Sequence, residues 1–397
     1  MQIPIVRLAL GDAEVEATGR VIRSGWIAQG PEVAAFEREF AAAVGAPCAV
    51  AVSSCTVALE LCLRVAGVRP GDDVATVSHS FIATANAVVA VGARPIFVDV
   101  QADTYNMDPA ALARAITPRT RAILCVHQMG FPCDLPAVLA IARPRGLPVI
   151  EDAACAIGSE IRIDGDWQRI GRPHGLMACF SFHPRKLITT GDGGMITASD
   201  PSLAEHLRLL RQHAMLVPST ARHDSRQVTL ETFSEPAFNF RMTDLQAAVG
   251  RPQLARLPAI IAERRALAAR YAKALADHPL LAPPSEPPWA RGNWQSYPMT
   301  LRPGGGMSQI EIMQFLLDRG VASRRGIGNA HAEPAYVKAA WSCGPQDCDP
   351  AAHAAGRCLR LPVSERARDN TILLPLFHGM SPAEQDHVVA SLRALPG

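Results

Sequence analysis

Residues 179–194 read Cys179-Phe180-Ser181-Phe182-His183-Pro184-Arg185-Lys186-Leu187-Ile188-Thr189-Thr190-Gly191-Asp192-Gly193-Gly194 and set one lysine among small, hydroxyl-bearing and turn-forming residues. A lysine in a partly desolvated pocket loses basicity, and its amine can then form a Schiff base with an aldehyde. A solvated lysine in a loop between a strand and a turn would have the same local sequence. The rest of the chain has to separate these two interpretations.

Short apolar segments alternate with helical patterns through the first half of the chain. The predicted strands are residues 49–53, 73–77, 94–98, 122–126 and 148–151, and the predicted helices are residues 32–44, 57–65, 83–91, 109–115 and 135–142. This alternation predicts an α/β fold with a mostly parallel sheet covered by helices. Ser54, His127 and Asp152 follow predicted strands, and the carboxyl ends of parallel strands are where functional residues gather.

The second half of the chain has a different organisation. A long helical pattern covers residues 252–277, a proline-rich connector covers 283–288, and a strand (296–301) and two helices (308–318 and 382–395) follow. We therefore expect a large domain, residues 1–251 with the N-terminal segment, and a small C-terminal α/β domain, residues 252–397. The long helix would join them.

Composition and charge exclude several classes of function. Hydrophobic residues make up 48% of the chain, charged residues 19%, and the formal net charge is +2. No strong field favours nucleic acid or an anionic membrane, and no apolar run reaches the roughly 20 residues that span a bilayer. The N-terminus lacks a basic region followed by an apolar one. We expect a cytoplasmic protein that acts on small molecules.

The ten cysteines are scattered, mostly singly within apolar segments, which is typical of buried cysteines in a reducing compartment. The exception is the run Cys343, Cys348, His353 and Cys358. Its five-residue spacing lacks the paired C-x-x-C of structural zinc sites. The sequence therefore favours a loose surface loop here, and no metal is expected.

A hydroxyl-rich turn, Ser54-Cys55-Thr56, follows the first predicted strand and begins the next helix. The first amides of a helix have no intrahelical partner and lie at the positive end of its dipole, so they attract phosphate. Ser181, five residues before Lys186, offers another hydroxyl. The turn and Ser181 are candidate phosphate ligands.

Asp152 and Phe81 complete the groups that a pyridoxal 5'-phosphate (PLP) enzyme requires. Such an enzyme needs a lysine for the Schiff base, a carboxylate against the pyridine nitrogen, an anion site for the phosphate and an aromatic face over the ring. Asp152 precedes Lys186 by 34 residues and would keep the ring nitrogen protonated. Singly, Asp152 could cap a helix beginning at Ala153, and Phe81 could be a core aromatic. The ordered set favours the cofactor.

At this point the chain resembles a known family, the DegT/DnrJ/StrS PLP-dependent aminotransferases of fold type I, which make amino sugars from nucleotide-linked keto sugars. The motifs that carry the resemblance run along nearly the whole chain: Arg23-Ser24-Gly25-Trp26, Gln29-Gly30-Pro31, Ser54-Cys55-Thr56, Gly71-Asp72-Asp73-Val74, Gly92-Ala93-Arg94-Pro95, Val98-Asp99, His127, Gly130, Glu151-Asp152-Ala153-Ala154, Ser181-Phe182-His183-Pro184-Arg185-Lys186 and Asn239-Phe240-Arg241-Met242-Thr243-Asp244-Leu245-Gln246-Ala247-Ala248. The implied architecture is aspartate aminotransferase-like.

The resemblance implies a role for each candidate residue. Lys186 would form the Schiff base with PLP and move the proton between two carbons, and Asp152 would hold the pyridine nitrogen. Phe81 would stack on the ring. The remaining cofactor-binding residues would be Ser54, Cys55, Thr56, Cys155 and Ser181, with Asn239 reaching the phosphate in the neighbouring subunit. A homodimer with shared active sites would follow. From the residues alone, Asn239 is only a polar residue before a helix that begins near Thr243.

Three positions depart from the family pattern. Cys55 stands where relatives have glycine, so it fits only if its backbone needs no positive φ. Cys155 stands where relatives have Gln or His, which weakens the expected contact with the cofactor's phenolic oxygen. Arg324, Arg325 and His331 stand where relatives often carry aromatic residues and proline, and arginines suit a phosphate or a carboxylate. Together with Trp26 and His183, they are candidate substrate residues.

The resulting prediction is a PLP-dependent aminotransferase that moves an amino group from glutamate or glutamine to a keto sugar, most of all a nucleotide-linked one. One alternative is a cyclitol or another keto sugar as the acceptor. An alternative of another class is a non-catalytic PLP-binding regulator, which the retained Lys186 and Asp152 disfavour because such a protein needs no electron sink. Relatives that remove a hydroxyl carry His at the lysine position, and Lys186 argues against that branch.

Overall fold

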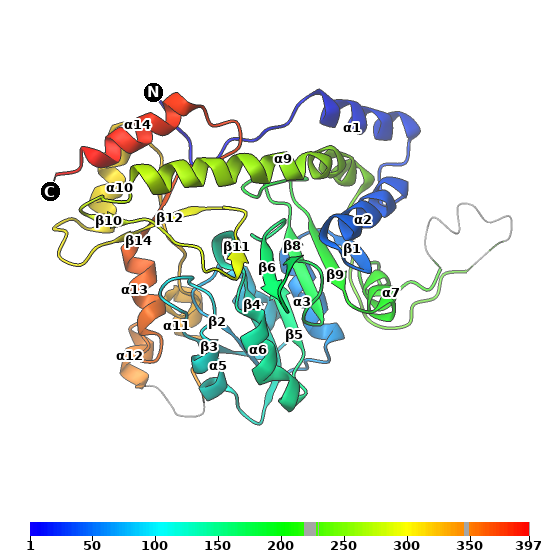
Figure 1. Cartoon of the computed structure of the whole chain (residues 1–397). Helices are drawn as coiled ribbons and strands as arrows, with labels where there is room; N and C mark the ends of the chain where they lie inside the picture. The colour runs from blue at the N-terminus through cyan, green and yellow to red at the C-terminus, as the bar shows by residue number, and fades with distance from the viewer. Residues whose placement is uncertain (218–227, 229, 345–348, 397) are drawn as a thin grey trace.

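A computed structural model describes residues 1–217, 228, 230–344 and 349–396 of the chain. The helices are α1 (Asp12–Ser24), α2 (Pro31–Val44), α3 (Cys55–Val65), α4 (Ala83–Ala90), α5 (Pro109–Ala115), α6 (Leu135–Ala142), α7 (Pro201–Leu210), α9 (Asp244–Ala274), α10 (Gln309–Asp318), α11 (Pro334–Val337), α12 (Pro350–Ala354), α13 (Pro362–Asn370) and α14 (Pro382–Arg393). The strands are β1 (Cys48–Val52), β2 (Asp73–Val77), β3 (Arg94–Val98), β4 (Thr120–Val126), β5 (Val149–Asp152), β6 (Glu160–Ile163), β7 (Asp166–Arg169), β8 (Met177–Ser181), β9 (Gly194–Ala198), β10 (Leu281–Ala282), β11 (Ala290–Arg291), β12 (Tyr297–Leu301), β13 (Arg324–Arg325) and β14 (Thr371–Leu374). Figure 1 shows their arrangement.

The central sheet has seven strands in the order β1-β9-β8-β5-β4-β2-β3. Four neighbouring pairs are parallel, and only β9 runs antiparallel to its two neighbours, β1 and β8. The predicted α/β fold with a mostly parallel sheet is therefore confirmed. Because β8 and β5 are parallel, Ser181 and Asp152 end neighbouring strands at the same edge of the sheet.

Both faces of the central sheet are covered because its strands are apolar on both sides. In β1, Ala49 and Ala51 join one apolar cluster with residues of α2, α5, α6 and α9, whereas Val50 and Val52 join a second cluster with residues of α3, α4 and α7. The polar side chains therefore lie at the ends of the strands, which the helices do not cover.

The long helix α9 begins earlier than the pattern from residue 252 predicts. Thr243 and Gln246 form a capping box, in which the Gln246 amide donates to Thr243 Oγ1 at 3.2 Å and the Thr243 amide donates to Gln246 Oε1 at 2.9 Å. The helix then continues through Pro252 and Pro258, each of which removes one backbone donor. The two helical segments predicted near 243 and 252 are one helix.

The C-terminal part has a four-stranded antiparallel sheet in the order β10-β12-β14-β13. α9 contributes Leu254 to the core of the central sheet and Tyr271 to the core of this second sheet, and Figure 1 shows the helix spanning both. Ile3 packs into the second core, and its amide donates to the Gly320 carbonyl at 2.8 Å. The proposed division at residue 251 falls within α9 and stays a prediction.

Several elements have no counterpart in the sequence prediction. β6 and β7 form a hairpin that pairs with β11. β11 has two residues and follows the proline-rich connector predicted for residues 283–288. These strands are too short to give a periodic signal.

No helix among the described residues is long and apolar enough to cross a membrane.

Asp244 ties the start of α9 to the start of α2. Its Oδ1 accepts from the amides of Gly30 at 2.8 Å and Val33 at 3.0 Å, and its Oδ2 accepts from the Glu32 amide at 3.1 Å. Burial raises the pKa of Asp244, which shows that these hydrogen bonds only partly offset its desolvation.

We expect Asp244→Ala to lower the free energy of unfolding by about 2 kcal/mol, because three amides at a helix N-terminus lose their acceptor. Asp244→Asn keeps one acceptor oxygen and should lose less. Urea denaturation of the two variants beside the parent chain measures both values. Equal losses for Ala and Asn would show that the carboxylate does not act as the cap.

Candidate active site

Polar side chains from four elements meet beyond the strand ends of the central sheet. β8 ends in Ser181, which lies in register with Gly194 of β9, and Gly194 lies in register with Val52 of β1. A Cβ built on Gly194 would lie 2.6 Å from the backbone of Ser54. The N-terminus of α3 therefore rests directly against β9, next to Ser181, and only glycine permits this approach.

The N-terminus of α3 has the properties of an anion site. Ser54 is its N-cap, and the side-chain oxygen accepts from the Val57 amide at 3.3 Å. The amides of Cys55 and Thr56, in the first turn, have no intrahelical carbonyl to bond. The Thr56 side chain is exposed and the Ser181 side chain is half-buried. The structure thus brings the predicted phosphate ligands together.

Cys55 fits this turn without strain. It occupies the first helical position of α3, and it is not among the residues with positive φ. Its side chain is buried in the apolar cluster formed with α3, α4 and α7 rather than directed at solvent. Burial raises the pKa of the Cys55 thiol well above its ordinary value, which keeps it in the neutral form. The condition set by the sequence is met.

Asp152 is buried and is held by two hydrogen bonds. Its Oδ2 accepts from Thr84 Oγ1 at 2.8 Å, and its Oδ1 accepts from the Ala154 amide at 3.2 Å. Because Thr84 donates its only proton to Asp152, Ser80 must donate its own to Thr84 Oγ1, 2.8 Å away. Burial raises the pKa of Asp152, and the two hydrogen bonds and Lys186 oppose this rise.

Lys186 lies in a turn after β8, and its Nζ lies 3.0 Å from Cys155 Sγ. The expectation that desolvation makes this lysine less basic is wrong for the chain by itself. Burial does lower the pKa of Lys186, but the contact with Cys155 and the carboxylate of Asp152 outweigh burial and raise the pKa above its ordinary value. The sequence could not reveal this, because Cys155 and Asp152 come from other elements.

Phe81 and Asn239 are both exposed. Phe81 lies between β2 and α4, and 67% of its surface is exposed, which is unusual for a large aromatic side chain. Asn239 is also exposed, and its Oδ1 accepts from the Arg241 amide at 3.4 Å. Neighbouring Phe240 accepts through its carbonyl from the Ser53 amide at 2.8 Å, so this segment lies beside the end of β1.

The side chain of His127 is bonded to buried partners of its own. It is fully buried; its Nδ1 accepts from the Cys133 amide at 2.9 Å, so the ring proton lies on Nε2 and points to Glu151 Oε2 at 3.1 Å. Glu151 Oε1 accepts in turn from the Gly175 amide at 2.9 Å. Both ring nitrogens of His127 are therefore engaged by protein groups.

The five candidate substrate residues are dispersed. Trp26 is half-buried, and its Nε1 donates to the Gln29 carbonyl at 3.0 Å. His183 is half-buried beside the lysine turn, and burial lowers its pKa. Arg324 and Arg325 are exposed on β13, where Arg325 pairs with Glu333 at 3.3 Å.

His331 is different, because its side chain has no exposed surface. Ser78 Oγ lies 2.6 Å from its Nδ1, and it packs against Phe97 and Trp341. Burial lowers the pKa of His331 to about 4, so the ring is neutral at physiological pH. A neutral, fully buried ring of this kind does not suit a substrate ligand.

Residues 293–295, a strand-free segment before β12, clamp the two loops of the site. Asn293 Nδ2 donates to the Cys155 carbonyl at 2.8 Å, and Gln295 Nε2 donates to the Arg185 carbonyl at 2.6 Å. Gln295 Oε1 is buried with no hydrogen-bond partner among the described residues. Neither this segment nor Thr84 is among the residues predicted from sequence. The signal for Thr84 is a hydroxyl three residues after Phe81, in the first turn of a helix.

The residues present fit PLP. The donor set has the required chemistry: free helix amides and hydroxyls for a phosphate, a buried carboxylate oriented by Thr84 for a cationic nitrogen, and a lysine beside both. The close approach that Gly194 permits places the phosphate cradle at the same sheet edge as Asp152.

Comparison with known proteins gives a consistent result. The model of the DegT/DnrJ/EryC1/StrS aminotransferase family matches residues 9–393. The spore coat polysaccharide biosynthesis protein SpsC of Bacillus subtilis (strain 168) is 35% identical over 386 residues, which are 97% of this chain and 94% of that protein.

Solved structures agree over the whole chain. DesV of S. venezuelae, crystallised in complex with a ketimine intermediate, is 33% identical, with a TM-score of 0.84 and coverage of 99% of this chain and 98% of DesV. The PLP form of the putative sugar aminotransferase Spr1654 of Streptococcus pneumoniae is 26% identical, with a TM-score of 0.87 and coverage of 99% and 98%.

Proposed function

Because this chain belongs to the DegT/DnrJ/EryC1/StrS aminotransferase family, we propose that it moves the amino group of glutamate or glutamine to a nucleotide-linked keto sugar. It is a sugar aminotransferase with the fold type I architecture, and its cofactor is PLP, as predicted. The observation that carries the proposal is the convergence of Lys186, the Thr84–Asp152 pair and the N-terminus of α3 at one sheet edge. The family match, and not the geometry of the site, supports an enzyme over the alternative of a non-catalytic regulator.

The roles of the residues follow from their contacts. Bound PLP supplies a carbonyl carbon that bonds to amines and a ring that withdraws the electron pair left by a departing proton. Asp152 would hold a positive charge on the ring nitrogen, and Thr84 fixes the direction of its carboxylate. The amides of Cys55 and Thr56, together with Ser181, would hold the phosphate, and the exposed ring of Phe81 would provide a stacking face.

Lys186 is the proton carrier of the proposed mechanism. It would remove the proton from the donor's amino-bearing carbon, which requires the uncharged amine, and return it to the cofactor's former aldehyde carbon on the other side of the nitrogen. The contact with Cys155 and the carboxylate of Asp152 raise the pKa of Lys186 in the chain alone. A cation held against Asp152 removes one of these influences and lowers that pKa toward the working range. Gln295 and Asn293 keep the two loops at the distance that this transfer needs.

The exposed arginines support a nucleotide-linked acceptor over a free cyclitol or a free keto sugar. Arg324 and Arg325 stand on the edge strand β13, and a diphosphate is the part of a nucleotide sugar that guanidinium groups bind best. Arg325 is already paired with Glu333, so a substrate phosphate would have to compete for it. A free cyclitol has no group that uses this charge.

The acceptor is tested by steady-state kinetics with nucleotide-linked and free keto sugars. We expect Arg324→Ala and Arg325→Ala to raise the KM of the nucleotide-linked acceptor about tenfold or more, since each charged hydrogen bond contributes roughly 1.5–3 kcal/mol. The KM of the amino donor should not change. Arg20→Ala, on the exposed face of α1, is the matched control. Equal kcat/KM for nucleotide-linked and free sugars would refute the nucleotide-linked acceptor.

We further propose a homodimer in which Asn239 of one subunit reaches the phosphate site of the other. Supporting observations are the exposure of Asn239 and the large apolar side chains around it, with Phe238 57% and Phe233 56% exposed. Exposed apolar surface of this kind is typical of an interface.

Hybrid dimers test the shared site. Mixing inactive Lys186→Ala and Asn239→Ala chains should form dimers in which one site has both residues intact, so activity should return to about one quarter of the parent value on statistical assortment. Mixing Lys186→Ala with Lys186→Arg chains is the control and should restore nothing. If the first mixture forms dimers by light scattering yet gains no activity, each site is complete within one subunit.

We also propose that the enzyme works in the reducing cytoplasm. No disulfide joins the cysteines of the described part of the chain, although Cys62 and Cys179 bring their sulfur atoms within 3.4 Å. In an oxidising compartment, such a pair would be exposed to disulfide formation. Ten titratable thiols in the denatured, freshly isolated protein would support this placement, and eight or fewer would contradict it.

A further inference from the structure

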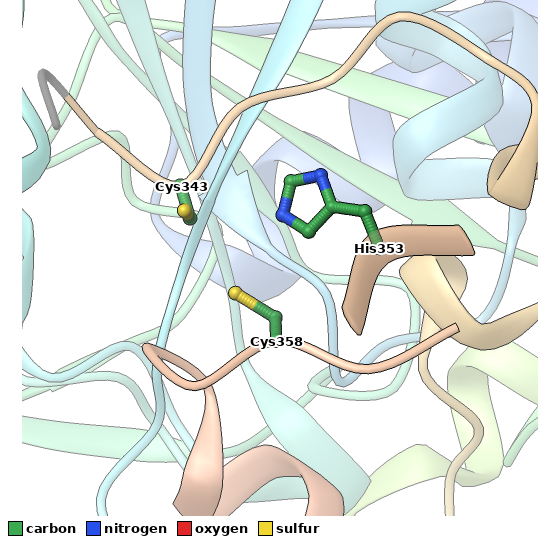
Figure 2. A group of neighbouring side chains, drawn as sticks. All are labelled: Cys343, His353 and Cys358. Carbon is green, nitrogen blue, oxygen red and sulfur yellow. The ribbon is translucent and has the colours of Figure 1, made fainter. Parts of the chain in front are cut away.

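Three potential metal ligands meet in the segment between α11 and α13, away from Lys186. Cys343 follows α11, His353 belongs to α12 and Cys358 precedes α13. The two sulfur atoms and a ring nitrogen of His353 all lie within 4.8 Å of one another, and Figure 2 shows the side chains pointing toward a common centre. Sequence spacing favours a loose surface loop here, but Cys343 is only 6% exposed and Cys358 only 1%.

The spacing of these atoms suits a zinc ion. Zinc binds sulfur at about 2.3 Å and nitrogen at about 2.0–2.1 Å, so ligand atoms of a tetrahedral site lie roughly 3.5–4 Å apart. The three ligand atoms lie within 4.8 Å of one another, and small side-chain rotations bring them to this shorter separation. Two thiolates and one imidazole are soft and borderline ligands, which select zinc over magnesium or calcium.

Each ligand is held by the structure around it. Ser342, next to Cys343, bonds to the edge strand β3: its amide donates to the Pro95 carbonyl at 3.0 Å, and its carbonyl accepts from the Phe97 amide at 2.7 Å. The Cys358 amide donates to Glu365 Oε1 at 2.7 Å. The His353 ring stacks on Trp341 with 4.0 Å between ring centroids. Ligands fixed in this way lose little freedom when a metal binds.

Charge also favours a divalent ion. Both cysteines belong to an apolar cluster that contains Phe97, Trp341 and Leu361. A thiolate in such surroundings is costly by itself, and two close together are more so. Two thiolates around a divalent cation form a neutral unit, so binding the ion removes this cost and releases two protons.

We propose that Cys343, His353 and Cys358 bind one Zn²⁺ ion that fastens α12 and the residues beside Cys343 and Cys358 to the edge of the central sheet. The site is structural: the same apolar cluster includes Ala85 of α4, whose neighbour Thr84 orients Asp152. The ion thus supports the outer side of α4 without contacting the cofactor. Three protein ligands leave one coordination position, and Cys348, which lies outside the described residues, is not part of the site as proposed.

Metal analysis of the full-length, tag-free holoenzyme tests the site. Protein made with added Zn²⁺ and passed through desalting should hold close to one zinc per chain, and Cys343→Ser and Cys358→Ser should each reduce zinc at least tenfold. Cys48→Ser is the matched control, because Cys48 is half-buried on β1, remote from the cluster, and its zinc content should equal that of the parent. Parent protein with less than a tenth of an equivalent of zinc, or a cluster variant with the parent's zinc content, would overturn the proposal.

A second measurement needs no variant and therefore survives a folding defect. Co²⁺ replaces Zn²⁺ in thiolate sites and gives strong sulfur-to-metal charge-transfer absorption in the near ultraviolet. Titrating the parent holoenzyme with Co²⁺, after zinc removal and against a cofactor-matched blank, should produce this band with an endpoint at one equivalent, and Zn²⁺ should abolish it. Absence of the band, or weak absorption typical of cobalt bound only by oxygen and nitrogen, would contradict thiolate ligation.

Discussion

Lys186→Ala should lower kcat of transamination by a factor on the order of 10⁴–10⁶, the range found when the central nucleophile of an enzyme is removed. The reason is that no other described amine faces Asp152 and the N-terminus of α3, so both the covalent attachment and the proton transfer are lost. Steady-state assays with glutamate and a keto sugar measure the loss. A variant that keeps a tenth of the activity would show that Lys186 is not the proton carrier.

The lysine content of the chain makes this prediction unusually easy to control. The sequence has three lysines, Lys186, Lys273 and Lys338, and the latter two are exposed. Lys273→Ala and Lys338→Ala should therefore keep the parent's activity. Borohydride reduction of the holoenzyme followed by peptide mass analysis should find the cofactor on Lys186 alone. Lys186→Arg keeps the positive charge but forms no such bond, and it should be as inactive as the Ala variant.

Asp152→Asn should lower kcat about 10²–10³-fold, because it removes the one charge that stabilises a cationic ring nitrogen while keeping the side-chain shape. The neutral amide can still pair with Thr84 and Ala154, so the effect should fall on the chemistry rather than on folding. Thr84→Val, which removes only the orienting hydrogen bond, should cost less. Comparing kcat of the three proteins at saturating substrate decides the order, and an Asn variant as active as the parent would exclude an electrostatic role.

Although Asp152→Asn should lower kcat, it should raise the stability of the cofactor-free protein. The pKa of Asp152 is raised above its ordinary value of 3.8. A raised pKa in the folded state means that the stability contribution is present below pH 3.8 and is lost as the pH rises through the folded-state pKa. At neutral pH the buried carboxylate therefore destabilises the fold, and Asp152→Asn should raise Tm of the cofactor-free protein. A lower Tm at pH 7 would contradict this.

Part of this site could be predicted from sequence because its residues lie at the ends of predicted strands. Asp152 ends β5 and the turn from Ser54 to Thr56 follows β1, so the predicted sheet brings them to one edge. Ser181 is predicted only from its spacing to Lys186, because β8, which it ends, is not among the predicted strands. The capping and turn signals are local, and for that reason α5 and α6 have the predicted bounds.

Other features depend on contacts that no local pattern contains. Thr84 faces Asp152 only because α4 packs beside β5, and the Cys155–Lys186 contact joins two loops 31 residues apart. The raised pKa of Lys186 follows from that contact and therefore could not be anticipated. Likewise, Cys343, His353 and Cys358 have an unusual spacing in sequence, and only the turn around α12 brings them together.

The direct test of the central claim is the origin of the nitrogen in the product. The holoenzyme is incubated with a nucleotide-linked keto sugar and with either ¹⁵N-glutamate or glutamine labelled with ¹⁵N on its α-amino group, ammonium being removed beforehand, and the amino sugar is analysed by mass spectrometry. The account predicts an amino sugar that carries ¹⁵N from the donor in the parent and in Lys273→Ala, and no product in Lys186→Ala. A labelled product from Lys186→Ala, or no labelled product from the parent with any keto sugar, would contradict it.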